Sequence, residues 1–164
     1  MTCARCKLFL VVLSLTGLLA CSSEEGPYRD QSAPIGATTR FTPQEFAGNW
    51  VIAASFQQRR KAPVAVTYSE DAQRLAVTSD ELAEVAGFYR QGVAGELIPF
   101  SDEQETLVVM WVDAEFRTAV VGTESGSIGV VLDREGDVPN DRAKAARNIL
   151  EFYGWDTSQL KRAF

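Results

Sequence analysis

The sequence predicts a mainly β protein with antiparallel strands and one α-helix near its carboxyl end. Between about residue 50 and residue 132, short runs in which apolar and polar residues alternate are separated by turns of a few residues, a pattern typical of antiparallel strands. After residue 139 the apolar period changes from two residues to about three and a half, which indicates an amphipathic helix. A chain of 164 residues, 46% of them hydrophobic, has room for one domain core.

The first segment of the chain has the pattern of a secretory signal. Arg5 and Lys7 precede residues 8–20, which carry no charge. A helix that spans a bilayer needs about 20 apolar residues, so this shorter run favours a signal peptide over residues 1–20. Leu18-Leu19-Ala20-Cys21 resembles the lipobox of bacterial lipoproteins, whose cysteine receives diacylglycerol. The resemblance implies a lipid anchor at Cys21; a plain signal peptide that happens to end near a cysteine is the alternative.

The residues after Cys21 bear on location. Ser22, rather than aspartate, follows the cysteine, and the sorting rule of enteric lipoproteins then implies transfer to the outer membrane, on its periplasmic face. Residues 21–40 are polar, contain glycine and proline and show no period, so we expect them to tether the membrane to a domain at 41–164.

The domain begins with a helical turn and continues with strands. Thr42-Pro43-Gln44-Glu45 has the form of a capping box with proline at the first helical position, which predicts one short turn that ends before Gly48. Strands are predicted at 50–56, 62–68, 74–78, 107–112, 116–122 and 128–132. Residues 82–100 could hold a helical turn, but Gly87, Gly92 and Gly95 favour two strands there.

Two segments indicate a second layer. Residues 107–112, LVVMWV, are apolar on both faces, so this strand is expected to be buried on both sides. In the predicted helix, Ala146, Ile149, Leu150 and Tyr153 form one apolar stripe, whereas Arg142, Lys144, Arg147 and Glu151 lie mostly off it. Gly154 suits the end of the helix. We therefore expect the helix to pack its stripe on the outside of the sheet.

Seven or eight short antiparallel strands form either a sandwich or an up-and-down barrel, and periodicity does not separate the two. Gly48-Asn49-Trp50, preceded by a helical turn, resembles the first signature of the lipocalin family. Residues 113–120, DAEFRTAV, resemble the second signature, and Val131-Leu132-Asp133-Arg134 resembles the third. The resemblance implies an eight-stranded up-and-down lipocalin-like barrel with the carboxyl-terminal helix on its outside, and bacterial members of the family are commonly lipoproteins.

The resemblance also implies how one end of the barrel is closed. Trp50 would fill the narrow end and Arg134 would lie across its ring, while Gly48 would let the backbone bend into the first strand without a Cβ. The alternative is a core tryptophan with Arg134 as a solvated surface charge.

An eight-stranded barrel either fills itself with side chains or holds one small ligand. Similar proteins of the bacterial outer membrane are thought to bind fatty acids or lysophospholipids, so the resemblance implies a small hydrophobic ligand. Alternation predicts that the cavity wall includes Ile52, Ala54, Phe56, Val109, Trp111, Thr118 and Val120, with the inward parity left open. The domain is short for the family, which leaves a small cavity, or none, as an alternative. The alternative function is a periplasmic scaffold for a protein partner, with a filled barrel and an exposed apolar patch.

Other classes of function have little support. The chain contains no histidine, and its carboxylates lack the spacing of a calcium loop, so no metal or other cofactor is expected. Asp113, Glu115 and Asp133 read as turn residues and solvated charges rather than as an acid–base pair, and residues 133–141 as a solvated linker, so no enzymatic activity is expected. The formal charge of −6 argues against nucleic-acid binding.

Overall fold

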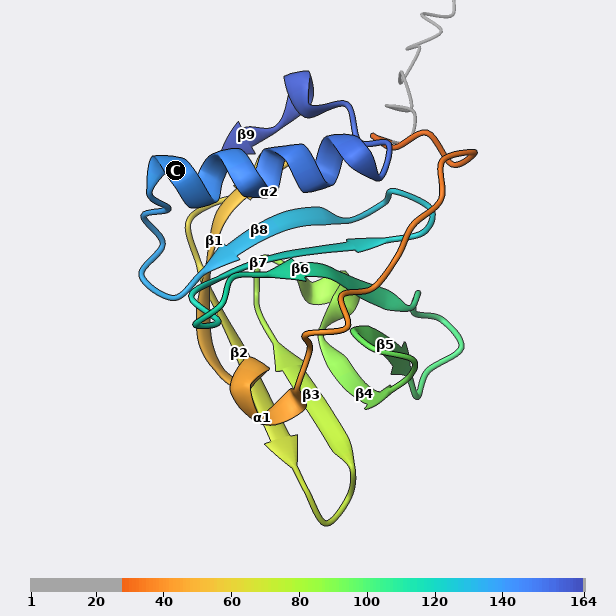
Figure 1. Cartoon of the computed structure of the whole chain (residues 1–164). Coiled ribbons are helices and arrows are strands. Elements are labelled where there is room, and N and C mark those ends of the chain that lie inside the picture. Colours follow the sequence, from red (N-terminus) through yellow and green to blue (C-terminus); the bar gives the residue numbers. More distant parts are fainter. Residues whose placement is uncertain (1–27, 164) are drawn as a thin grey trace, which may run out of the picture.

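The computed structural model describes residues 28–163, which form a closed antiparallel barrel with one long helix on its outside (Figure 1). The strands follow the order β2-β3-β4-β5-β6-β7-β8-β1, and β2 also pairs with β1, so the sheet closes into a ring. The predicted eight-stranded up-and-down barrel with an outer carboxyl-terminal helix is confirmed. An open sandwich is excluded because β1 pairs with β2 along one edge and with β8 along the other.

The elements lie close to their predicted ranges. The strands are β1 (Gly48–Ser55), β2 (Pro63–Ser69), β3 (Arg74–Thr78), β4 (Gly87–Gln91), β5 (Glu96–Pro99), β6 (Leu107–Val112), β7 (Thr118–Thr123), β8 (Gly129–Asp133) and the short β9 (Lys161–Arg162). The helices are α1 (Pro43–Phe46) and α2 (Asn140–Phe152), with single 3₁₀ turns η1 (Ala83–Val85) and η2 (Thr157–Gln159). Residues 82–100 thus hold both a helical turn and the two favoured strands. No helix among residues 28–163 is long and apolar enough to cross a membrane.

Two apolar clusters hold the domain together. The first fills the barrel and includes Trp50, Ile52 and Leu132. The second lies between the barrel wall and α2, where Ala146 and Leu150 from the helix pack against Val120 and Val131. Strand β6 contributes alternate side chains to both clusters, which is why its sequence is apolar on both faces.

Two β-bulges change which side chains face inward. In β1 the register against β8 shifts between Ile52 and Ala54, and in β6 the register against β7 shifts between Val109 and Trp111. An extra residue at a bulge inverts the inward–outward alternation for the rest of the strand. Side chains beyond each bulge therefore face the opposite side from the one that simple alternation predicts.

Residues 28–40, predicted as part of a tether, instead pack along the barrel. Arg29 is 2% exposed, pairs with Trp155 in an isolated β-bridge and donates hydrogen bonds to the carbonyls of Tyr153 and Glu124. Further on, the Thr38 amide donates to the Val109 carbonyl at the β6 bulge. The folded unit therefore begins by residue 28. The predicted signal peptide, Cys21 and the rest of the tether lie outside the described residues.

Candidate functional site

One end of the barrel, where β1 begins and β8 ends, is sealed by an arginine over an indole. The Arg134 guanidinium carbon lies 3.7 Å from the centre of the buried Trp50 ring. The guanidinium also donates to carbonyl oxygens of Phe116 at 3.0 Å, Asn49 at 3.1 Å and Ala47 at 3.1 Å, and burial lowers its pKa. The structure thus brings together two of the three residues predicted to close the barrel.

Gly48, the third of these residues, lies beneath the same guanidinium. Its φ of +116° belongs to a region that L side chains rarely adopt, and a Cβ there would lie 2.8 Å from Nη1 of Arg134. Glycine at this position therefore allows both the backbone bend into β1 and the close approach of the arginine.

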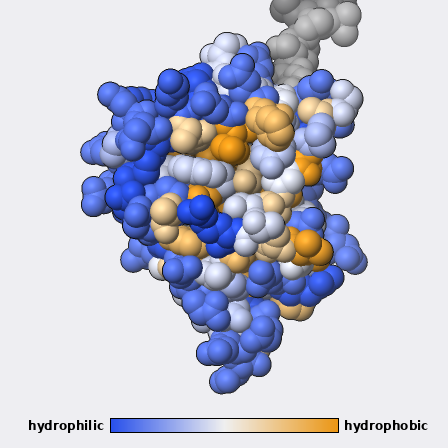
Figure 2. All heavy atoms as spheres, viewed as in Figure 1, coloured by the Kyte–Doolittle hydropathy of each residue, from blue (hydrophilic) through white to orange (hydrophobic). Residues whose placement is uncertain are grey.

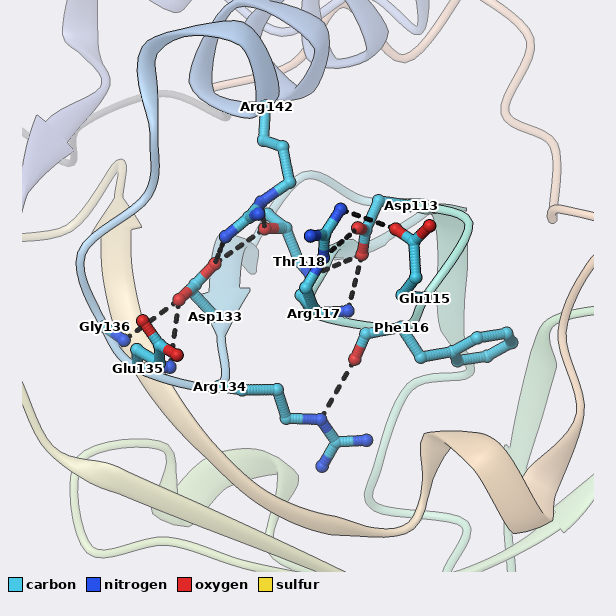
Figure 3. Close-up of polar contacts among 10 residues, drawn as sticks. All are labelled: Asp113, Glu115, Phe116, Arg117, Thr118, Asp133, Arg134, Glu135, Gly136 and Arg142. Carbon is cyan, nitrogen blue, oxygen red and sulfur yellow. Dashed lines mark hydrogen bonds and ion pairs between the residues drawn. The ribbon is translucent and has the colours of Figure 1, made fainter.

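A second polar cluster ties α2 to the barrel wall (Figure 3). Asp133, fully buried, accepts hydrogen bonds from the Thr118 hydroxyl at 2.6 Å, from the amides of Glu135 and Gly136, and from Arg142 at 3.2 Å. Burial alone would raise the pKa of Asp133, but these hydrogen bonds together lower it. The prediction that Asp133 is a solvated turn charge is wrong, because the arginine of the helix reaches down to it.

Asp113 caps the turn between β6 and β7 in a similar way. It is 7% exposed and accepts hydrogen bonds from the backbone amides of Arg117 and Thr118 and from the Arg117 side chain. Burial opposes its ionisation, yet the donors together hold its pKa below the usual value. These carboxylates are occupied by structural donors, so the cluster fastens the turn and the helix.

The interior of the barrel has almost no free space. The void inside it has a volume of about 30 Å³ and is lined only by apolar side chains, among them Val66, Leu97 and Val130. That volume corresponds to about one water molecule in the liquid. Binding cavities for small molecules measure roughly 300–1,000 Å³, so the interior has no room for an acyl chain.

The other end of the barrel is covered by residues 79–86, between β3 and β4. Leu82 and Val85 from this segment are buried in the interior cluster. The segment is held by Arg59, which donates to the Glu81 carbonyl and forms an ion pair with Glu84. Both ends of the barrel are therefore closed.

The structure divides the predicted cavity wall between two sides. Ile52 and Val109 face the filled interior. Four other members of the set pack outside the barrel in the cluster beneath α2: Ala54, Phe56, Trp111 and Val120. Thr118 also points outward, toward Asp133 and Arg142. The inward orientation predicted for Ala54, Phe56 and Trp111 is wrong because these residues follow the two bulges. The inward orientation predicted for Thr118 and Val120 is wrong because the other set of alternate residues in β7, Ala119 and Val121, faces the interior.

A large hollow lies outside the barrel, between α2, the β1–β8 wall and the carboxyl-terminal segment. We call it the outer groove; its volume is about 610 Å³. Its floor consists of small apolar residues, including Ala53, Ala54, Val131 and Ala146, and Leu160 and Ala163 complete its wall. Its rim carries Lys61, Lys144, Arg147 and Arg162, with Asp137 as the one acid among its lining residues.

Sequence reasoning missed this groove. The bases of α2 have the pattern of the solvated face of an amphipathic helix. Simple alternation places Ala54 in the interior, because the bulge at residue 53 leaves no mark in the sequence. The run of small residues on one side of α2, Ala143 and Ala146, was the available signal.

No family model matches the sequence, and no curated protein matches it either. Among solved structures, the cockroach major allergen Per a 4 is similar, with a TM-score of 0.58 at 13% identity over 82% of this chain and 95% of the allergen. Lobster apocrustacyanin A1 is similar with a TM-score of 0.55 at 12% identity, over 73% of this chain and 77% of that one. Both are lipocalin-family proteins.

The fold is that of the lipocalins. At identities of 12–13%, the similarity shows a shared architecture, and it does not by itself indicate that the ligand is the same. In this protein a packed interior contrasts with a large hollow on the outer wall.

Proposed function

We propose that the protein binds or carries a small hydrophobic ligand, a fatty acid or a lysophospholipid, in the cell envelope, and that a lipid at Cys21 anchors it to the periplasmic face of the outer membrane. The observation that carries the ligand proposal is the outer groove. Its volume of about 610 Å³ lies within the usual range for small-molecule sites, and its floor is apolar. The lipocalin fold supports a binding function over catalysis.

The place of binding is the outer wall rather than the interior. For an acyl chain to enter the barrel, Leu82 and Val85 would have to leave the interior cluster, which would expose buried apolar surface. The groove needs no such rearrangement, since it is open between α2 and the β1–β8 wall. A ligand carried there would also exchange readily with a membrane.

The test starts from the chain from Ser22 onward, which lacks the lipid-bearing cysteine but contains the whole folded unit of residues 28–163. Native mass spectrometry and organic extraction would identify co-purified acyl chains, and displacement of a fluorescent fatty acid would measure affinity. We expect one acyl ligand per chain. A protein that purifies empty and does not bind the fluorescent fatty acid would overturn the proposal.

The anchor is tested separately, because ligand binding does not depend on it. Full-length protein with Cys21→Ser should lose the mass of the lipid and no longer fractionate with the outer membrane. If the wild-type amino-terminal peptide carries no lipid, the anchoring part of the proposal is wrong.

The scaffold alternative has its own observation in its favour. The interior is filled, and the outer face of β4 and the segment after β5 expose Phe88 at 50% and Phe100 at 61%. In the view of Figure 2, hydrophobic residues gather in the middle of the face, whereas the hairpin that joins β2 to β3 is hydrophilic. A chain that stays empty in the extraction experiment yet loses a defined protein partner on Phe88→Ser would favour this function.

A further inference from the structure

We propose that the outer groove selects anionic single-chain amphiphiles, with the alkyl chain on its floor and the acidic head against Lys144 and Arg162. This inference rests on the proposed function and adds the charge class of the ligand and the residues that recognise it. The shared chemistry is a carboxylate or phosphate group on an alkyl chain.

The rim of the groove carries an excess of positive charge in a chain whose formal charge is −6. Of its four bases, Lys61 is paired with Asp137 at 2.9 Å. Arg147 donates to the Thr157 carbonyl, a neutral acceptor that leaves its charge uncompensated. The side chains of Lys144 and Arg162 form no hydrogen bond or ion pair with any described residue. Three positive charges are thus unbalanced around one apolar hollow.

The second large hollow offers a contrast within the same protein. It has a volume of about 520 Å³ and lies near the turn between β6 and β7. The charged residues that line it are three acids and three bases, namely Asp113, Glu115, Asp141, Arg40, Arg117 and Arg142. Several of these pair with one another, as Arg117 does with Asp113 and Glu115. Of these two hollows, the outer groove is therefore the one with unbalanced positive charge.

The floor of the groove suits an alkyl chain. Ala53 and Ala54 both line it because the β1 bulge turns two successive residues toward the outside. On the helix side, Ala143 and Ala146 present only methyl groups, which leave space beside the point where α2 packs on the wall. A chain laid there would bury apolar surface, while its charged head would reach the bases at the rim. Charge and shape thus favour an ion with a long apolar tail.

The ligand test compares molecules with the same alkyl chain. Dodecanoate, dodecyl phosphate and 1-dodecanol would be titrated against the chain from Ser22 onward. The two anions would be kept below their micelle concentrations and the alcohol below its solubility limit. We expect both anions to bind at least about fivefold more tightly than the alcohol, with the difference shrinking as salt rises from about 0.05 M to 0.5 M because salt screens exposed charges. Tighter binding of dodecanoate than of dodecyl phosphate, or the reverse, separates a fatty acid from a lipid phosphate as the source.

Variants with matched controls locate the site. Lys144→Glu and Arg162→Glu should each weaken dodecanoate binding about five- to tenfold, whereas Lys161→Glu, the neighbouring exposed lysine that does not line the groove, should leave it unchanged. Ala143→Trp should fill the groove and abolish binding. Ala145→Trp, on the same helix but lining the second hollow, should not. Circular dichroism checks that each variant is folded.

The outcomes separate the two proposals. Weakened binding in the groove variants alone supports the site. Dodecanoate binding that is equal in wild type, Arg162→Glu and Ala143→Trp overturns the groove and leaves a lipid-binding function with its site elsewhere. Equal affinity for dodecanoate and 1-dodecanol overturns the charge selection. If none of the three ligands binds, both the inference and the proposed function are wrong.

Discussion

Replacing Arg134 with alanine should destabilise the domain by about 3–4 kcal/mol. The guanidinium lies 3.7 Å from the ring centre of the buried Trp50, and a cation over an indole at a partly buried site contributes about 1–2 kcal/mol. Its bonds to the part-buried carbonyls of Phe116 and Ala47 contribute about 1 kcal/mol each. Bonds to the more exposed Asn49 and Glu45 carbonyls are replaced by water, so they add little.

Thermal unfolding measures this cost. For a domain of this size, 1 kcal/mol shifts the melting temperature by roughly 3–5 °C, so Arg134→Ala should lower it by about 9–20 °C. Near-ultraviolet circular dichroism reports on the indole environment directly. Arg134→Lys should recover only part of the loss because an ammonium lacks the planar fork. Arg90→Ala, an exposed arginine on β4, is the control. A melting temperature for Arg134→Ala within about 2 °C of wild type would refute the closure role.

Four further changes test other contacts by urea denaturation. Gly48→Ala should cost about 1–3 kcal/mol, since its φ of +116° is strained for alanine and the new Cβ would meet the Arg134 guanidinium. Arg142→Met should cost about 2–3 kcal/mol because it leaves the buried carboxylate of Asp133 without its ion pair. Because the pKa of Asp133 is lowered in the folded state, its carboxylate stabilises the fold above the unfolded pKa of about 3.9, and this stabilisation is lost as the pH falls below that value. In Asp133→Asn, the free energy of unfolding should therefore fall less steeply with pH in that acidic range. Leu150→Ala, fully buried under the helix, should cost about 2–4 kcal/mol; a loss below about 1 kcal/mol would mean that α2 is not held by its apolar stripe.

Periodicity and the three signature regions were enough to predict the barrel. The strand at 74–78 and the strand at 107–112 have the predicted bounds, and α2 packs the predicted stripe against the wall. These features depend on the local spacing of apolar and polar residues, which can be read directly from the sequence. The packing of residues 28–40 was not predictable in the same way, because it depends on contacts such as that of Arg29 with Trp155, which are distant along the chain.

The cavity wall shows where alternation fails. Ile52 and Val109 precede the bulges and face inward, whereas Ala54 and Trp111 follow them and face outward. A bulge adds one residue without changing the apolar character of the strand, so nothing in the sequence marks the change of side. The sequence also does not indicate that Asp133 is buried, because its partner Arg142 lies on α2 and is brought to it only by the fold.

The docking of Arg29 also has a mechanical consequence. Its guanidinium is bonded to the carbonyls at residues 124 and 153 and lies 5.2 Å from the ring of Trp155. A pull on the chain before Tyr28 is therefore borne by the β7–β8 loop and the end of α2, and the first strand is not peeled from its neighbours. Under tension from the amino end, the contacts of Arg29 should break before the ring of strands opens.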